Sequence, residues 1–216
     1  MIELAAVMTA LQDSALPGAL PVLDDDARAL LFTEARTANS FAPDPVPDET
    51  LAAVWELAKW PPTAANTQPL RVTFVRSPEG KARLLPLMNE GNRAKTEAAP
   101  VVALLATDVD FHEFTEQTFP IRPELKDNME AAGTAGRESM ARFNGALQAA
   151  YFLLAARAHG LATGPMAGFD ADAVTAEFFP GERHRTLLVV NLGLPGENPW
   201  FDRLPRLPHS DVVSWA

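Results

Sequence analysis

The stretch RESMARFNGALQAAYFLLAARAHG, residues 137–160, decides how this chain should fold. Its apolar residues recur at the three- and four-residue spacing of a single α-helical stripe, and Gly160 supplies a helix end. Apolar side chains occupy much of the remaining circumference as well, which predicts burial on several sides. We therefore expect one long helix, whose stripe consists of Met140, Phe143, Leu147, Ala150, Tyr151 and Leu154.

Candidate strands lie on both sides of this helix. The segments 99–111 (APVVALLATDVDF) and 186–196 (TLLVVNLGLPG) are mostly apolar, as buried strands are. Residues 71–77 (RVTFVRS) alternate and are rich in β-branched side chains. Helices are expected in three further segments, 25–36, 50–60 and 79–88. This order lacks the regular alternation of a doubly wound sheet, so the sequence favours an α+β fold.

Outside these elements, the sequence contains an N-terminal extension, an irregular acidic segment and a C-terminal tail. We expect residues 1–23 to form an N-terminal extension with a short apolar helix, and residues 24–216 to form one domain. Residues 108–136 are acidic and irregular in pattern, and we interpret them as a mobile cover. Residues 199–216 are rich in large apolar side chains without a regular element, so they need a surface to pack on, such as a second subunit.

The charge of the chain excludes several classes of partner. The 216 residues carry a net charge of −10, which argues against binding to nucleic acid or to anionic membranes, because both are polyanions. Residues 1–50 hold 2 basic and 9 acidic groups, so the remainder is nearly neutral and is free to form a local anion site. No apolar run approaches the ~20 residues of a membrane span, and the start lacks a signal-peptide pattern. We expect a cytoplasmic protein.

Several kinds of chemistry are missing from the sequence. The absence of cysteine excludes disulfides, thiolate metal sites and cysteine nucleophiles. No dinucleotide-binding G-x-G-x-x-G, P-loop or G-x-S-x-G pattern occurs. The acidic residues of 108–116 are interpreted as a solvated stretch. No metal site is expected, because the four histidines lack metal-ligand spacing and are assigned to surface or helix-end positions: His112, His159, His184 and His209.

Two polar segments in the first third of the chain offer ligands for a phosphorylated, planar molecule. Residues 36–39 (RTAN) supply a guanidinium fork and a hydroxyl, which are natural phosphate ligands. In 61–69 (PPTAANTQP), prolines fix a loop, small residues let a ring approach the backbone, and Asn66 and Gln68 offer amide donors and acceptors. Taken alone, each segment is equally compatible with a helix end or a connector.

Two later segments complete this set. Asn92 and Lys95 are three residues apart in 91–95 (GNRAK), so they share a face on a helical turn. In 164–170 (GPMAGFD), glycines on both sides of a Pro-Met pair permit close approach of the backbone to a planar ring. The alternative for each is a solvated turn or loop. Together the four segments suit flavin mononucleotide (FMN).

In these segments the sequence resembles the nitroreductase family of flavoenzymes. The resemblance rests on RTANSF, PPTAANTQP, GNRAK, GPMAGFD and RLPRLP (203–208), which occur in the family's order, and it covers residues 28–210. Within the family, KWPPTAAN, GNRAKTEAAP, TGPMAGFD and RLPRL look most like the malonic semialdehyde reductase branch. Three positions depart from common family residues: Asn39 replaces Arg or Lys, Ala64 replaces Ser, and Ala167 replaces a Glu of some members.

The resemblance implies a fold and a set of site residues. The fold would be an α+β sandwich, a mostly antiparallel or mixed sheet flanked by helices, in an intertwined homodimer with FMN at the interface. The helix 137–159 would lie in that interface, and residues 199–216 would wrap the partner. The residues implied in FMN binding are Arg36, Thr37, Asn39, Pro62, Thr63, Ala64, Asn66, Asn92, Lys95, Pro165, Met166, Ala167, Gly168 and Arg206.

The resemblance also implies how these residues share the cofactor. Arg36, Thr37 and Arg206 would hold the phosphate, with Arg203 a weaker candidate, while Asn92 and Lys95 would meet the ribityl chain and the pyrimidine edge. The loop residues Thr63, Ala64 and Asn66 would line the ring edge. Pro165 and Met166 would pack on a ring face, and the backbone of Ala167 and Gly168 would meet N4 and N5.

The implied activity is hydride transfer from NADH or NADPH through FMN, by a ping-pong mechanism. A positive Lys95 would stabilise the anionic reduced flavin, and no side chain is assigned as a proton donor. We expect the acceptor to be malonic semialdehyde, reduced to 3-hydroxypropanoate. The alternatives are a broad nitroaromatic or quinone reductase, a flavin-binding protein without turnover and, less expected still, a structural α+β domain without a cofactor.

Overall fold

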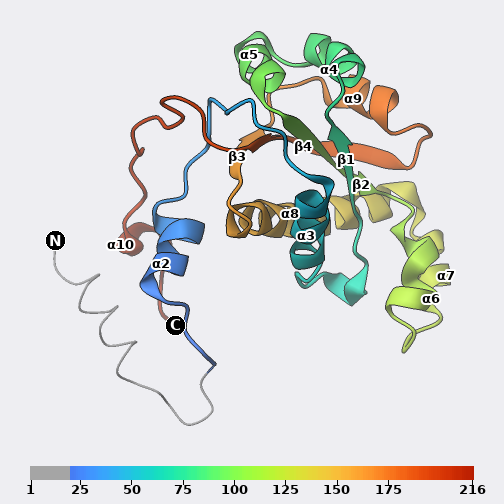
Figure 1. The fold of residues 1–216 in the computed structure, drawn as a ribbon. Coiled ribbons are helices and arrows are strands. Elements are labelled where there is room, and N and C mark those ends of the chain that lie inside the picture. Colours follow the sequence, from blue (N-terminus) through green and yellow to red (C-terminus); the bar gives the residue numbers. More distant parts are fainter. Residues whose placement is uncertain (1–19) are drawn as a thin grey trace. The chain divides into compact units, whose positions relative to one another are not determined.

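The structure is a computed structural model that describes residues 20–216, so most of the predicted extension and its helix lie outside the described residues (Figure 1). The described chain separates after Ala35 into two units. The first unit holds the helix α2, Asp25–Arg28, which continues as the π-helix η1, Ala29–Thr33. The carboxylate of Asp24 accepts a hydrogen bond from the backbone nitrogen of Ala27, as an N-cap does. This confirms a helix from residue 25, although it ends three residues earlier than expected.

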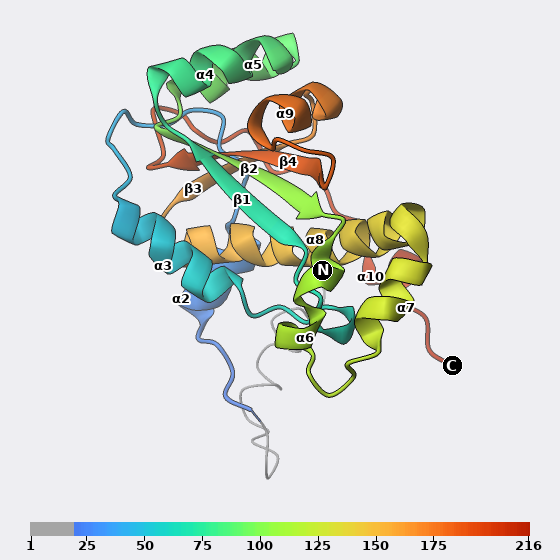
Figure 2. The ribbon, with the colours of Figure 1, turned by 90° about the vertical axis from the view of Figure 1, so that its right-hand side faces the viewer.

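The second unit is built on a four-stranded antiparallel sheet. Its strands are β1 (Leu70–Val75), β2 (Val101–Asp108), β3 (Ala162–Met166) and β4 (His184–Gly193), arranged in the order β1-β2-β4-β3 (Figures 1 and 2). The three predicted strands are confirmed, and so is the α+β class.

The strand β3 differs from the sequence-based expectation, which treated residues 164–170 as a loop. Gly164 and Pro165 are weak strand formers, and together they hide the pattern on which strand prediction depends. The strand occupies an edge of the sheet, where a proline is tolerated because one side of the backbone has no strand partner.

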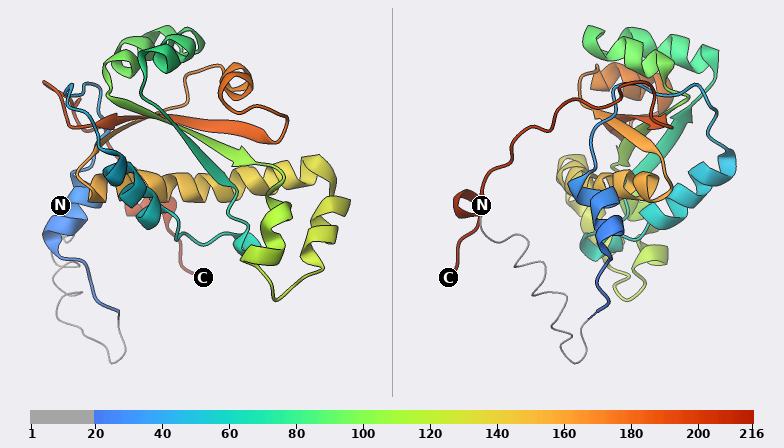
Figure 3. Two further views of the ribbon diagram at one scale, coloured as in Figure 1. Left: turned by 45° about the vertical axis from the view of Figure 1, so that its right-hand side comes forward. Right: turned by 60° about the vertical axis from the view of Figure 1, so that its left-hand side comes forward.

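Helices cover both faces of the sheet. The helices α3 (Asp48–Ala58) and α8 (Gly133–Ala158) lie on one face, and Figures 2 and 3 show the other face covered by α4, α5 and α9. Their bounds are α4 Pro78–Leu84, extended by η3 Leu85–Leu87, then α5 Glu90–Ala98 and α9 Ala171–Phe178. The predicted helices in 50–60, 79–88 and 137–160 are therefore confirmed, while α9 was not predicted and the GNRAK segment belongs to a full helix.

The central strand β2 explains why two hydrophobic cores form. All eight of its residues are buried, and alternate side chains point to opposite faces of the sheet. Val101, Ala103 and Leu105 join a core with α3 and α8, and their neighbours Val102 and Leu104 join a core under α4 and α9. A strand buried on both faces has no polar side, which is why 99–111 is apolar without alternation.

Residues 108–136 do not form the irregular segment that was expected. They contain η4 (Phe111–Phe114), α6 (Thr115–Thr118) and α7 (Leu125–Ala131). The interpretation of the acidic stretch as solvated is wrong at Asp108, whose side chain is 1% exposed. The surface assignment of His112 is also wrong, because its ring is buried and its Nε2 contacts Glu130.

The long helix and the tail expose apolar side chains within a single chain. On α8, Phe143 is 67% exposed, and Leu147 and Tyr151 are also exposed, so burial on several sides is not achieved by this chain alone. The tail contains only a short helix, α10 (His209–Val212), and Figure 3 shows it in red as an extended segment. Its large apolar side chains are exposed: Trp200, Phe201, Leu204, Leu207, Val212 and Trp215.

Candidate functional site

The helix α5 and the loop after β3 meet through Asn92 and Gly168. The side-chain Nδ2 of Asn92 donates to the carbonyl oxygen of Gly168 over 2.9 Å, and the backbone nitrogen of Asn89 donates to the same oxygen over 3.0 Å. A Cβ at position 168 would lie 2.6 Å from that Nδ2. Only glycine therefore fits at 168 without displacing the amide, which places two predicted segments in direct contact.

The segment 36–39 joins the same region. The backbone nitrogen of Ala38 donates to the carbonyl oxygen of Thr163 over 2.9 Å, and a Cβ at Gly164 would lie 2.8 Å from the oxygen of Ala38. The Lys95 ammonium lies 3.5 Å from Oδ1 of Asn39. We call the resulting group the basic half-site: Arg36, Thr37, Asn39, Asn92, Lys95 and residues 165–168.

The basic half-site has the charge and the exposure of an anion site. The side chains of Arg36 and Lys95 are both half-buried, so their charges are held at the surface and remain open to solvent on one side. Asn39 and Asn92 are also half-buried and carry amide groups, and Thr37 is exposed. Two cations, a hydroxyl and two amides form a donor set that suits a phosphorylated molecule with polar edges.

The side chain of Met166 faces away from this surface. It is 6% exposed, and its sulfur lies 3.8 Å from Oγ1 of Thr96 and 4.0 Å from Nδ2 of Asn191. Alternation along β3 leaves Pro165 half-buried on the opposite side. Pro165 and the backbone of 166–168 are therefore the parts of this strand that remain available to a ring, whereas the sequence suggested packing by the Met166 side chain.

The loop 61–69 forms a second group, which we call the loop half-site: Pro62, Thr63, Ala64 and Asn66. Asn66 donates from Nδ2 to the carbonyl oxygen of Thr118 over 2.7 Å and accepts on Oδ1 from Gln68 over 3.0 Å. The φ angles of Ala65, Asn66 and Gln68 are 51°, 50° and 45°. Left-handed backbone at a residue other than glycine costs roughly 1–2 kcal/mol, so surrounding contacts must hold this loop.

Within one chain, the sheet register places the two half-sites at opposite ends of strand β2. The loop half-site leads into Leu70, which pairs with Thr107 near the end of β2, while α5 leads into Val101 at its beginning. Six residues of strand separate these ends, which corresponds to about 20 Å. Within residues 20–216, a single chain therefore does not bring Thr63, Ala64 and Asn66 together with Lys95.

The predicted phosphate ligand Arg206 lies in the exposed tail. Its guanidinium donates to the carbonyl oxygens of Leu204 and Pro205, over 3.0 and 3.2 Å, both in its own segment. The start of the tail does reach the basic half-site, because Nη1 of Arg36 lies 3.4 Å from the carbonyl oxygen of Phe201. The chain thus brings the tail to Arg36 but does not fold Arg206 onto it.

A charged network that sequence reasoning missed lies beside the loop half-site. The buried Asp108 accepts from Arg183 over 2.7 and 2.9 Å and from Arg71 over 2.8 Å. Burial alone would raise the pKa of Asp108, but hydrogen bonds from Arg183 and the charge of Arg71 hold it below its ordinary value. The ring of Phe114 lies 5.3 Å from the guanidinium of Arg71 and 6.0 Å from that of Arg183.

Two buried amides of α8 were also missed. Asn144 and Gln148 are each 1% exposed. Asn144 contacts Ala64 of the loop half-site, and Gln148 contacts Leu70, the first residue of β1. The available signal was the presence of two amides one turn apart in the mostly apolar segment 137–160, outside its predicted stripe. Such residues are buried only when their polar atoms are bonded.

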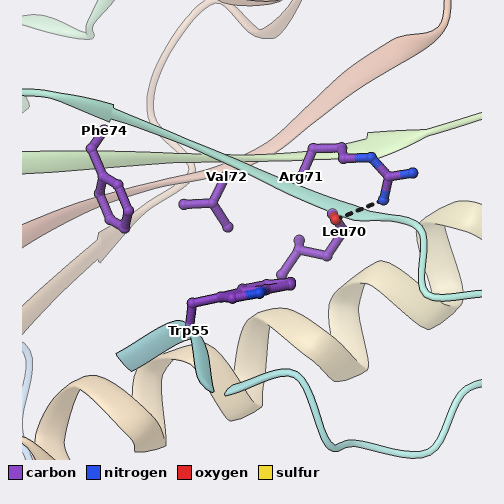
Figure 4. A pocket seen from close by; sticks show the side chains of 5 residues that line it. All are labelled: Trp55, Leu70, Arg71, Val72 and Phe74. Atoms are coloured by element: carbon purple, nitrogen blue, oxygen red, sulfur yellow. Dashed lines mark hydrogen bonds between the residues drawn. The ribbon is translucent and has the colours of Figure 1, made fainter. Parts of the chain in front are cut away.

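A cavity of about 330 Å³ lies away from the predicted residues, between α3 and the edge strand β1. Figure 4 shows the Trp55 ring beneath Leu70 and Val72, with Phe74 at one end and Arg71 at the other. Its lining is mostly apolar and includes none of the predicted cofactor residues, so this cavity is separate from both half-sites.

Residues 20–216 contain neither a candidate metal-ion cluster nor a candidate membrane-spanning helix. No group of three or more His, Asp or Glu side chains is arranged to hold a metal ion in that part of the chain. Among the same residues, no helix combines the length and the apolar character needed to cross a membrane.

The chain is similar to known proteins over most of its length. The model of the nitroreductase family matches residues 33–194. A relative from Streptomyces coelicolor is 55% identical over 199 residues, which cover 92% of this chain and 98% of the relative. Another from Leptothrix cholodnii is 52% identical over 185 residues, covering 86% and 93%. Both carry the provisional name NADH dehydrogenase/NAD(P)H nitroreductase.

Solved structures show the same fold. A provisionally named NAD(P)H:FMN oxidoreductase from Staphylococcus epidermidis superposes with a TM-score of 0.77 at 21% identity, covering 91% of this chain and 98% of that one. A provisionally named nitroreductase from Exiguobacterium sibiricum, solved in complex with FMN, gives 0.76 at 21% identity, with coverages of 90% and 99%.

Proposed function

The chain belongs to the nitroreductase family, and from this membership we propose that it is an FMN-dependent NAD(P)H oxidoreductase. The observation that carries the proposal is the meeting of Lys95, Asn92 and Gly168 at one surface, with residues 36–39 beside them. The Exiguobacterium sibiricum structure, which has this fold, was solved in complex with FMN, and this supports the choice of cofactor.

The residues at the basic half-site fit an FMN. The missing side chains of Gly164 and Gly168 let Ala38 and Asn92 pack directly against the backbone of 164–168, and the half-buried Lys95 and Arg36 provide positive charge for an anionic group. Arg36 and Thr37 would bind the phosphate, with Asn39 beside them. Asn92 would orient the ribityl chain, and Pro165 and the backbone of Ala167 and Gly168 would contact the ring.

The complete site would require a second copy of the chain. The two half-sites lie about 20 Å apart along β2, so the Thr63–Asn66 loop can reach an FMN only on a partner. The exposed face of α8 around Phe143, Leu147 and Tyr151, and the exposed tail, offer the apolar surface that a homodimer would bury. Such a tail would also be placed to bring Arg206 to a phosphate.

When bound, FMN would supply the chemistry of hydride transfer between NADH or NADPH and a second substrate. Lys95 would hold a positive charge beside the pyrimidine edge and stabilise negative charge that develops there. The loop half-site of the partner would exclude water from the ring edge and fix the position of the incoming substrate.

The proposed acceptor is malonic semialdehyde, which would be reduced to 3-hydroxypropanoate. In this reaction NAD(P)H supplies a hydride to the aldehyde carbon, solvent supplies a proton to its oxygen, and NAD(P)⁺ leaves. A broad nitroaromatic or quinone reductase is the second candidate, and the nitroreductase part of the relatives' provisional names favours it.

The test uses the purified full-length chain. We expect a yellow protein with the absorption bands of FMN, which NADH or NADPH bleaches without oxygen in a stopped-flow measurement. A colourless protein that does not take up added FMN would contradict the cofactor assignment. Binding without bleaching would instead leave a flavin-binding protein without turnover. Steady-state rates with malonic semialdehyde, nitrofurazone and menadione then decide between the two acceptor classes.

The domain boundaries are part of the same proposal. We propose that residues 24–216 carry the activity, that residues 1–23 are an extension to it, and that the enzyme is cytoplasmic. A chain that begins at residue 24 is expected to bind FMN with the affinity of the full chain.

A further inference from the structure

Two amide side chains on α8 hold the loop half-site from beneath. Asn144 and Gln148 are four residues apart, so they project from the same face of the helix, and both are almost fully buried. Neither belongs to the residues assigned to the cofactor. An amide is less favourable than an apolar side chain in a core unless its polar atoms are hydrogen-bonded. A position that served only packing would therefore favour an apolar residue.

Each amide accepts a hydrogen bond from the backbone at one end of the loop. Oδ1 of Asn144 accepts from the backbone nitrogen of Ala64 over 2.7 Å, while its Nδ2 donates to the carbonyl oxygen of Met140 over 2.9 Å. Oε1 of Gln148 accepts from the backbone nitrogen of Leu70 over 2.9 Å. The helix therefore fixes residues 64–70 at both ends.

The loop between these two bonds needs such support. Ala65, Asn66 and Gln68 all have positive φ angles, and such backbone persists only where the surroundings hold it. The helix itself is held close to the sheet at Gly145, where a Cβ would lie 2.3 Å from Cγ2 of Thr107. This close approach lies next to Asn144, the residue that accepts from the backbone of Ala64.

We propose that Asn144 and Gln148 are positioning residues for the cofactor site, which they affect only through the backbone of 64–70. They would fix Thr63, Ala64 and Asn66 in the geometry that an FMN on the partner subunit meets. This inference rests on the proposed function. The residue before Asn144, Phe143, is exposed, so α8 would hold the loop with one face and contact the partner with another.

The test compares three variants of the full-length enzyme. Asn144→Leu removes the acceptor for the Ala64 N–H, and Asn144→Asp keeps an acceptor there. Phe152→Leu disturbs the buried face of the same helix at a side chain that has no polar atom to bond the loop. Two quantities are measured: the Kd of FMN for the apoprotein, and amide hydrogen exchange of a peptide covering 63–70 by mass spectrometry.

We expect Asn144→Leu to raise both the Kd of FMN and the exchange rate of the loop at least tenfold. Asn144→Asp should change each less than threefold. Phe152→Leu should lower Tm while leaving both within twofold of wild type. Gln148→Met provides the same comparison at the Leu70 end, so the test stands if Asn144→Leu does not fold.

Two results would overturn the inference. One is a loop exchange rate and an FMN Kd in both Asn144→Leu and Gln148→Met that stay within twofold of wild type. The other is an equal rise of both quantities in Phe152→Leu at a matched loss of Tm. If wild type binds no FMN, the proposed function fails on its own, and unchanged loop exchange in these variants still separately overturns the positioning role.

Discussion

The amide of Asn92 lies 2.9 Å from the carbonyl oxygen of Gly168 and joins α5 to the loop after β3. These residues are 76 positions apart in the chain, and their contact exists only because position 168 lacks a side chain. The glycine and the amide thus depend on each other for the shape of the basic half-site.

Gly168→Ala is expected to displace Asn92, because the new Cβ would lie 2.6 Å from its Nδ2. We expect a loss of about 1–3 kcal/mol in the free energy of unfolding, typical of overpacking, and weaker FMN binding. Urea denaturation and FMN titration measure the two effects. Gly91→Ala on the same helix is the control: its Cβ would meet nothing within 4 Å, and alanine favours the helix, so stability should hold or rise by up to about 1 kcal/mol.

Lys95→Ala is expected to weaken FMN binding by about 10- to 100-fold, because a hydrogen bond to a charged group contributes about 1.5–3 kcal/mol. Fluorescence titration of the apoprotein with FMN gives the Kd. Lys126→Ala, on the exposed side of α7, removes the same charge away from the basic half-site and should leave the Kd within twofold. An unchanged Kd in Lys95→Ala would remove the role assigned to this residue.

Asp108→Asn is expected to lower the free energy of unfolding at pH 7 by about 3 kcal/mol, because Arg71 and Arg183 lose their shared carboxylate. The pKa of Asp108 is lowered in the folded state, so its contribution is present above the ordinary value of 3.8 and is lost as pH falls through the folded pKa. Urea denaturation from pH 7 to pH 3 measures this. The difference in the free energy of unfolding between wild type and variant should become smaller toward pH 3. A difference that is independent of pH would contradict the ion pairs of Asp108 with Arg71 and Arg183.

Phe143→Glu is expected to convert the protein from a dimer to a monomer and to release FMN, because it places a charge on the exposed apolar face of α8. Light scattering after gel filtration should give twice the chain mass of 23.3 kDa for wild type and 23.3 kDa for the variant. Ala176→Glu introduces the same charge at an exposed position of α9, and this variant should stay dimeric with FMN bound. A dimeric Phe143→Glu would show that this face is not the interface.

The sequence predicted elements with strong patterns and missed those whose pattern is broken. The helix α8 and the strand β1 follow from the periodicity of their side chains, and β2 and β4 follow from apolar runs, because these elements face the hydrophobic cores. The strand β3 could not be found in this way, since Gly164 and Pro165 carry no strand signal and only pairing with β4 makes them extended. Asp108 was misjudged because burial beside Arg71 and Arg183 is a property of the fold.

By itself, the sequence determined the α+β class, the long helix, the family and the polar segments 36–39, 61–69 and 91–95, because these depend on local composition and order. Only the tertiary structure decided which segments meet. Hydrogen bonds hold 36–39 beside β3 and Lys95, and the antiparallel register of β1 and β2 places the loop with Thr63 and Asn66 about 20 Å away. Contacts between residues far apart in the chain follow from strand pairing and burial, which no local pattern specifies.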